Sequence, residues 1–175
     1  RGGNDTILGA GGWDVLYGGT GEDSILGGSG EDTIFGDAGD DTIDGGTEND
    51  TIHGGDGNDS LLGGDGNDSI FGDAGTDTVD GGAGGDTISA NGQVGGGDGA
   101  DYISGSGALS GDAGNDTVFG SGTLDGGADD DQLYVQAGAI GLGGAGNDTL
   151  SGWSPYTYDT GAQYLDGGNG NDVVN

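Results

Sequence analysis

The chain has 175 residues, of which 50 are glycine and 32 are acidic, whereas lysine and arginine together contribute one residue. The formal charge of −31 argues against nucleic acid and anionic membranes as partners, because both would be repelled. There is no cysteine to form disulfides, and no apolar stretch is long enough to insert directly into a membrane as a helix. No signal peptide is recognisable, and we expect the chain to be a piece of a longer repeat protein.

A nine-residue unit, Gly-Gly-x-Gly-x-Asp-x-U-x with U aliphatic, recurs through the chain, as in the successive units 54–62 and 63–71. A hydrophobic content of only 29% would by itself predict disorder, but flexible linkers do not keep one position aliphatic. Positions one to six of the unit are rich in Gly, Asn and Asp and predict a turn. Positions seven to nine predict a short strand whose middle residue points inward.

Nine complete units follow one another from Gly9 to Ser89, after a partial unit at residues 1–8. Two units per coil would place successive turns alternately on two edges of a flattened solenoid. The inward aliphatic residues of this part are expected to be Ile7, Leu16, Ile25, Ile34, Ile43, Ile52, Leu61, Ile70, Val79 and Ile88.

After Ser89, six-residue segments alternate with the nine-residue units. Three of them are Ala90–Gly95, Gly105–Ser110 and Gly120–Asp125, with Val94, Leu109 and Leu124 at the fifth position and no aspartate in register. We interpret Val135–Leu142 as a longer hexapeptide around Ile140, and Gly152–Asp166 as a hexapeptide ending at Leu165 after an insertion. The insertion contains Trp153, Pro155, Tyr156 and Tyr158. The nine-residue units of this part contribute the inward residues Ile103, Val118, Leu133, Leu150 and Val174.

These repeats predict an all-β fold, a right-handed parallel β-roll of stacked two-strand coils. The coils are expected to be 18 residues long (9+9) over residues 1–89 and about 15 residues long (9+6) over 90–175, with an insertion at about 152–160. One edge should carry the sixth-position aspartates Asp14, Asp32, Asp50, Asp68, Asp86, Asp101, Asp116, Asp131, Asp148 and Asp172. The other edge should carry Asp5, Asp23, Asp41, Asp59 and Asp77. We therefore expect metal-binding turns on both edges before Ser89 and on one edge after it.

Such rows of aspartates need a cation. Coils stack about 4.8 Å apart, and two carboxylates at that distance repel by about 0.9 kcal/mol in water and roughly 3.5 kcal/mol at an effective dielectric constant of 20. Hard carboxylate oxygens suit a divalent cation such as Ca²⁺, whereas Mg²⁺ needs a tighter octahedron and dehydrates reluctantly. One Ca²⁺ for each adjacent pair of aspartates gives about 13 ions, whose charge would nearly neutralise the roll.

The units resemble the RTX (repeats-in-toxin) family of calcium-binding nonapeptide repeats, and the resemblance covers nearly the whole chain. It implies a parallel β-roll in which calcium lies between like turns of successive coils. The ligands would be the motif aspartates, here the fifteen named above, and backbone carbonyls of the glycine-rich turns. Departures from the motif occur at the third position (Gly2, Gly11), the fourth (Glu48, Asp129) and the fifth (Trp13, Gly85).

The sequence predicts no enzyme in this chain. The single histidine, His53, is expected to be an outward surface residue, and no catalytic motif interrupts the repeat. An ice-binding solenoid is a further alternative, because threonines recur at the seventh position (Thr33, Thr42, Thr51, Thr78, Thr87). The ninth position does not match them, so they are better explained by the preference of threonine for strands.

Aromatic residues at the ninth position, Tyr17, Phe35, Phe71, Phe119 and Tyr134, are predicted to share one strand stack. They indicate either a protein–protein or self-assembly contact, or a cover over a thin sheet. The prediction for the whole chain is a calcium-binding structural module of a secreted bacterial protein at the cell surface, such as an adhesin, surface-layer or fibre protein. The alternative is the calcium-dependent folding and secretion module of an exported RTX enzyme or toxin.

Overall fold

The computed structural model describes residues 2–153 and 163–175, in which the regular elements are all strands. The strands are β1 (Thr6–Gly11), β2 (Val15–Thr20), β3 (Ser24–Ser29), β4 (Thr33–Ala38), β5 (Thr42–Thr47), β6 (Thr51–Asp56), β7 (Ser60–Asp65), β8 (Ser69–Ala74), β9 (Asp77–Ala83), β10 (Thr87–Asp98), β11 (Tyr102–Ala113), β12 (Thr117–Ala128), β13 (Gln132–Gln136), β14 (Ile140–Ala145), β15 (Thr149–Trp153), β16 (Tyr164–Asp166) and β17 (Val173–Val174). The predicted insertion, including Tyr156 and Tyr158, lies mostly outside the described residues.

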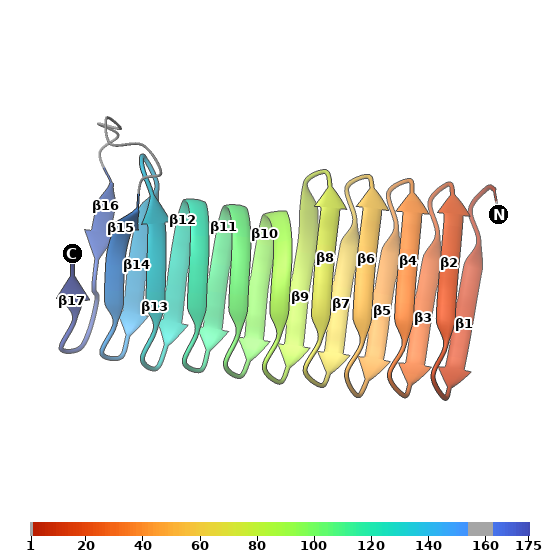
Figure 1. Ribbon diagram of the computed structural model, residues 1–175, viewed down its shortest axis with the longest axis horizontal. Helices are drawn as coiled ribbons and strands as arrows, with labels where there is room; N and C mark the ends of the chain where they lie inside the picture. The colour runs from red at the N-terminus through yellow and green to blue at the C-terminus, as the bar shows by residue number, and fades with distance from the viewer. Residues whose placement is uncertain (1, 154–162) are drawn as a thin grey trace.

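The strands form two layers that face each other across a narrow interior (Figure 1). Each strand of the first half pairs in parallel with the next strand but one, so that β2, β4, β6 and β8 make one layer and β1, β3, β5, β7 and β9 the other. The long strands β10, β11 and β12 each contribute to both layers. The all-β parallel solenoid expected from the repeats is therefore confirmed.

The length of a coil changes along the chain. Aspartates that face each other in successive coils are 18 residues apart in the first half and 15 residues apart in β10–β12. Figure 1 shows the consequence: the upper edge drops abruptly from β9 to β10–β12, whereas the lower edge continues past this point without a step. The spacing then widens to 17 and to 24 residues toward the C-terminus.

The core is a single file of aliphatic side chains between the two layers. From Ile25 to Leu150 the predicted inward residues at the eighth position are all buried, and so are Val94, Leu109 and Leu124 of the hexapeptides. Ile7 and Leu16 of the first coil are partly buried, and Val174 of the last described coil is half exposed. Each strand turns one aliphatic side chain and one glycine toward the interior, as Ile34 and Gly36 of β4 do. The core is therefore only one apolar side chain thick on each strand.

The interpretation of Val135–Leu142 was wrong about its inward residue. Ile140 is 41% exposed, and its neighbour Gly141 holds the position that pairs with Leu124 and Leu165. The space inside this coil is filled instead by Val135, which is fully buried, and by Ala139. A methyl carbon of Val135 lies 2.5 Å from the point where a Cβ at position 141 would be, so the interior has no room for a second side chain.

Candidate metal centre

The sixth-position aspartates form two continuous rows, one along each edge of the roll. The backbone N–H of each aspartate donates to the Oδ1 of the aspartate one coil further on, with distances of 2.7 to 3.1 Å. One row runs unbroken from Asp14 to Asp172, and the other runs from Asp5 to Asp77. The structure thus brings together all fifteen predicted residues in the predicted order, while their role as ligands stays a prediction.

The second carboxylate oxygen of these residues is buried and unpaired. Twelve of the aspartates, from Asp23 to Asp148, are no more than 3% exposed. Among the described residues, the Oδ2 atom of every row member except Asp172 is inaccessible to solvent and has no hydrogen-bond partner. A buried acceptor without a donor costs about 1–3 kcal/mol, and more when it is charged. Fourteen such atoms in register indicate a shared partner of a kind that is not protein.

A glycine at the first position leaves a small space beside each unpaired oxygen. A Cβ built on Gly45 would lie 2.6 Å from Asp50 Oδ2 and 2.6 Å from the carbonyl oxygen of Gly63 in the next coil. The arrangement repeats at Gly27, beside Asp32 Oδ2 and the Gly45 carbonyl. Each unit therefore brings a carboxylate oxygen of one coil and a carbonyl oxygen of the next to the border of a space that a side chain would fill.

Burial also makes the negative charge of the rows unfavourable. It raises the pKa of Asp50, Asp59, Asp86 and Asp116 to about 6 and that of Asp131 to about 7. The hydrogen bond from the preceding backbone N–H lowers each pKa, but less than burial raises it, and neighbouring carboxylates add repulsion. At neutral pH these groups need either a proton or a cation.

The donor set fits a hard cation that accepts backbone oxygens. No three His, Cys, Asp or Glu side chains within the described ranges come together to hold an ion by themselves. A metal ion in these turns would therefore depend on one or two carboxylates and on glycine carbonyls. Seven or so oxygen ligands in a flexible arrangement are characteristic of Ca²⁺, whereas Zn²⁺ prefers nitrogen and sulfur.

The short row ends where a methyl group closes the space beside the aspartate. The first-position glycine opposite Asp77 is Gly72, and a Cβ there would lie 2.8 Å from the Cβ of Ala90 in the first hexapeptide. Beyond this point the edge is joined by other means: the Ser106 hydroxyl donates to Asn91 Oδ1 at 2.7 Å. Gly92, Gly107 and Gly122 stack in the left-handed region, with φ of 132°, 122° and 103°.

A second polar ladder runs beside the aspartates and escaped the sequence analysis. The Asn67 N–H donates to Asn49 Oδ1 at 2.7 Å, and the Gly85 N–H donates to Asn67 Oδ1 at 2.6 Å. These bonds run in the opposite direction along the roll from those of the aspartates. The recurrence of Asn or Asp at the fifth position was the sequence signal for this ladder. Glycine is tolerated at position 85 because that residue contributes only its backbone N–H.

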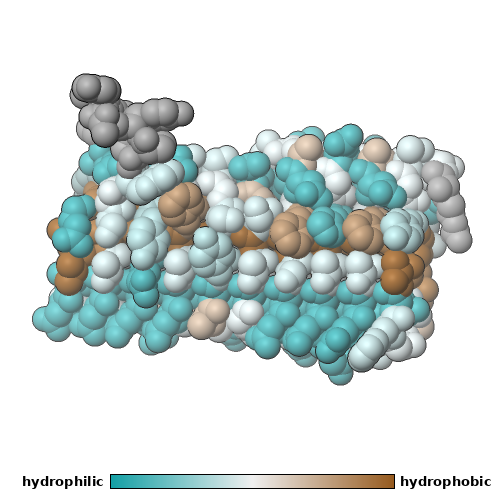
Figure 2. Space-filling view, in the orientation of Figure 1, coloured by the Kyte–Doolittle hydropathy of each residue, from teal (hydrophilic) through white to brown (hydrophobic). Residues whose placement is uncertain are grey.

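The outward aromatic residues form a stack of parallel rings. Tyr17 and Phe35 lie 4.9 Å apart, Phe35 and His53 5.1 Å, and His53 and Phe71 4.7 Å, with interplanar angles of 7° to 11°. His53 is therefore a member of this stack rather than an isolated surface residue, and its Nδ1 lies 3.1 Å from Asp73 Oδ2. Figure 2 shows this face, with brown side chains in a row across its middle.

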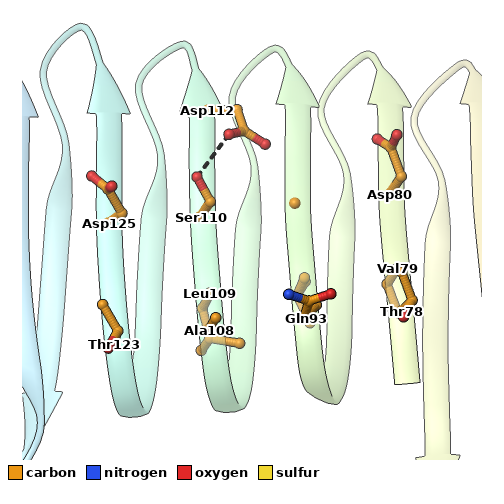
Figure 3. Close-up of a pocket in the computed structure, with 12 residues that line it drawn as sticks. Thr78, Val79, Asp80, Gln93, Ala108, Leu109, Ser110, Asp112, Thr123 and Asp125 are labelled. Carbon is orange, nitrogen blue, oxygen red and sulfur yellow. Dashed lines mark hydrogen bonds between the residues drawn. The ribbon is translucent and has the colours of Figure 1, made fainter. Parts of the chain in front are cut away.

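The opposite face has a shallow trough of about 480 Å³ across β9–β12 (Figure 3). Asp80 and Asp125 lie at its two ends, and Asp112 leans into it, where its Oδ1 accepts a hydrogen bond from the Ser110 hydroxyl at 2.7 Å. Gly95 provides the room for this carboxylate. The trough is open, and its carboxylates are separated along the sheet, so it differs from the buried rows.

A comparison with protein-family models gives a match to the RTX calcium-binding nonapeptide repeat. The matched residues are 1–25, 17–52, 53–88, 123–139, 142–154 and 158–175. Because the match covers more than half of the chain, the chain belongs to the RTX calcium-binding repeat family. The unmatched stretch 89–122 contains the first two hexapeptides, where the nine-residue period is interrupted. No curated protein matches the chain.

The protein is therefore a β-roll module of calcium-binding repeats, and the buried aspartate rows support Ca²⁺ as its ligand. The family is a structural repeat, so membership assigns no catalytic activity. RTX repeats are typical of secreted bacterial proteins. A search of the described residues found no helix that is long and apolar enough to cross a membrane.

Proposed function

We propose that this chain is a calcium-stiffened structural module of a secreted bacterial surface protein, such as an adhesin, surface-layer or fibre protein. The observation that carries the proposal is the row of buried aspartate oxygens without a protein partner. One such row runs from Asp14 to Asp172 and a second from Asp5 to Asp77, and each joins successive coils at a fixed spacing. The repetition of one identical turn suits a spacer with uniform stiffness better than a catalytic site, which needs groups of different character.

The fifteen row aspartates are the proposed protein ligands, together with carbonyl oxygens of the glycine-rich turns. Bound Ca²⁺ supplies positive charge and accepts oxygens from two coils at once. Nine adjacent aspartate pairs on the long edge and four on the short edge correspond to about 13 ions. The formal charge of −31 and the virtual absence of lysine and arginine mean that neutralisation has to come from outside the chain.

We further propose that the module has two parts that use calcium differently. Residues 1–89 would bind ions on both edges, and residues 90–175 on the long edge only. The closure of the Gly72 space by Ala90 and the hydroxyl–amide bond of Ser106 to Asn91 support this division. The 15-residue coils would then depend on a single row of ions.

The same chemistry supports a location outside the cell. Extracellular calcium modules bind their ions with dissociation constants of about 10⁻⁴–10⁻³ M, far above the calcium concentration of a cytosol. Without calcium, the repulsion within the rows opposes folding of a thin core. The chain would stay unfolded during synthesis and export and fold where calcium is abundant.

A calcium titration followed by circular dichroism tests the proposal. We expect a disordered spectrum in EGTA and a β-rich spectrum at millimolar Ca²⁺, with Mg²⁺ at the same concentration as the control that fails to replace it. Counting bound calcium after dialysis against a metal-buffered solution should give about 13 ions per chain. A β-rich spectrum that persists in excess chelator at pH 7.5 would overturn the calcium-dependent part of the proposal.

A further inference from the structure

The stack of rings on the face shown in Figure 2 stops at Phe71 and leaves one ring face without an aromatic neighbour. One face of Phe71 packs against His53 at 4.7 Å. On the other side, the residue in register with Phe71 is Ser89, and the next is Ser104. The brown row in Figure 2 is interrupted over β10 and β11 for this reason and resumes over β12.

The interruption is a hollow large enough for a ring. The depression between the serines and Phe71 measures about 200 Å³. An apolar cavity of about 150 Å³ is enough to bind benzene. The Ser104 hydroxyl is turned back toward the Ile88 carbonyl at 3.3 Å, so it does not extend across the hollow.

The far side of the hollow does not fill it. Phe119 is in register with Ser104, about 14 Å from Phe71 at three strand spacings. Its ring packs instead against Trp153, at 5.1 Å and an angle of 57°, and against Tyr134, at 6.4 Å. A planar group lying on Phe71 would therefore continue the stack at the spacing already set by Tyr17, Phe35 and His53.

The upper wall of the hollow is polar and negative. Asp73 and Asn91 line it together with Phe71 and the two serines. Asp73 uses Oδ2 for its contact with His53, and its Oδ1 makes no hydrogen bond to any of the described residues. No lysine or arginine lines the hollow, so a cationic group would meet an acceptor without a competitor.

We propose that the hollow between Phe71 and Phe119 binds an arylalkylamine, with its ring on the free face of Phe71 and its protonated aliphatic amine at Asp73. Stacking of the ligand ring on Phe71 supplies the shape requirement. The carboxylate supplies charge complementarity, which distinguishes the ligand from a neutral ring. This site is separate from the aspartate rows and needs only that the roll is folded.

Tryptamine is the probe, because it carries an indole ring and an ammonium group. Isothermal titration into the folded protein at 0.15 M salt, which screens the general negative charge, should show saturable binding of one equivalent. Indole tests the ring alone and butylamine the ammonium alone. We expect weaker binding of indole and no saturable binding of butylamine.

Ser89→Phe places a ring of the protein itself on the free face of Phe71, one strand spacing away, and leaves the net charge unchanged. It should lower tryptamine affinity at least tenfold, whereas the matched control Ser24→Phe, on the opposite layer, should bind like the wild type. Asp73→Asn should lower tryptamine affinity several-fold to the level of indole and leave indole itself unaffected. Equal tryptamine binding by wild type and Ser89→Phe, or full competition by butylamine, would overturn the proposal.

Two measures keep this test independent of folding and of calcium. Circular dichroism of each variant establishes that the roll is intact. If Ser89→Phe fails to fold, Phe71→Leu replaces it in the test: it removes the ring face without adding bulk and should also lower tryptamine affinity several-fold. The titration uses whichever calcium condition gives the β-rich spectrum. A failure of the calcium proposal would therefore leave the tryptamine result interpretable.

Discussion

The 18-residue coils of β1–β9 and the 15-residue coils of β10–β12 enclose the same aliphatic core but close with different turns. In the first region both edges consist of glycine-rich turns with a buried aspartate. In the second region one edge is made by hexapeptides, in which Ser106 bonds to Asn91 and stacked glycines take left-handed φ values. The aliphatic core passes through both regions without a break.

This comparison shows what the three extra residues of a nine-residue turn provide. A six-residue turn already closes the coil and keeps Val94, Leu109 and Leu124 buried, so the additional residues are not needed for the core. They position one carboxylate and several carbonyl oxygens on the edge. This comparison supports the proposal that the longer turn serves the cation, and that the number of such turns in a region sets how much that region depends on calcium.

The largest expected effect comes from interrupting the only aspartate row of the second region. Asp116→Ala removes the acceptor of the Asp101 N–H and two adjacent aspartate pairs. We expect a loss of about 3 kcal/mol or more in the calcium-loaded protein. Asp59→Ala makes the same local change, but the row through Asp50 and Asp68 still joins those coils, so a loss of about 1–2 kcal/mol is expected.

Calcium-dependent melting and amide hydrogen exchange of the two variants measure this difference. Asp116→Asn is the control, because its side-chain oxygen can still accept the Asp101 N–H while the charge is gone. A calcium midpoint close to that of Asp116→Ala would assign the loss to the ion rather than to the hydrogen bond. Equal destabilisation by Asp116→Ala and Asp59→Ala would contradict the single-row interpretation of the second region.

A methyl group in the space beside Asp50 should weaken calcium binding on the long edge. Gly45→Ala places a Cβ 2.6 Å from both Asp50 Oδ2 and the Gly63 carbonyl, and the backbone oxygen cannot move away easily. We expect the calcium midpoint to rise at least about tenfold, which corresponds to about 1.4 kcal/mol. Gly11→Ala is the matched control, because its Cβ would lie 3.0 Å from the Ser29 hydroxyl, which can turn away, and at an ordinary contact distance of 3.8 Å from the Ser29 carbonyl oxygen. A Gly45→Ala midpoint equal to that of Gly11→Ala would show that this space is not used by the ion.

Protons should replace calcium in part, with a sign fixed by the raised pKa values. The row aspartates have an ordinary pKa of 3.8 and folded values of about 6 for Asp116 and about 7 for Asp131. A group with a raised folded pKa stabilises the metal-free roll below pH 4 and loses that contribution as the pH rises through 6 to 7. Circular dichroism in EGTA should therefore show more β-structure at pH 5 than at pH 8.

Calcium should show the opposite trend, because it needs the ionised carboxylates. The calcium midpoint is expected to fall steadily from pH 5.5 to pH 8 and to level off above it. Sedimentation velocity at pH 5 controls for aggregation, since the net charge is reduced there. A calcium midpoint that is independent of pH between 5.5 and 8 would mean that protonation of the buried aspartates is not coupled to binding.

Much of this architecture could be predicted from the sequence because the repeat fixes both the register and the edge of each turn. The two aspartate rows follow from counting nine or six residues at a time, and the structure reproduces their order from Asp5 to Asp77 and from Asp14 to Asp172. This counting gives wrong positions where the nine- or six-residue period is interrupted. In the irregular segment after Tyr134, Ile140 was assigned to the interior, which is occupied by Val135, because no repeat indicated where the extra residues would be accommodated.

Features that depend on contacts between side chains of different coils were also beyond the sequence. The direction of the Asn49–Asn67–Gly85 ladder, opposite to that of the aspartates, depends on which side of the turn each side chain occupies. The place of His53 between two phenylalanine rings depends on rotamers that align only after the coils have stacked. Periodicity assigns a residue to a face, and packing decides what it contacts there.

The smallest expected effect tests whether the two regions unfold separately. Ala10 in the first region and Asp129 in the second both have φ of 79°, a left-handed conformation that costs a non-glycine residue about 1–2 kcal/mol. Ala10→Gly and Asp129→Gly should each stabilise the roll by about 1 kcal/mol, because glycine adopts this conformation without strain, although it loses more entropy on folding. If the regions unfold independently, hydrogen exchange will slow only in the region that carries the substitution. If the continuous aliphatic core couples them, as we expect from the unbroken contacts of Ile88 and Ile103, both substitutions will slow exchange throughout the roll. Slower exchange confined to one region would show that the change from 18-residue to 15-residue coils divides the roll into two folding units.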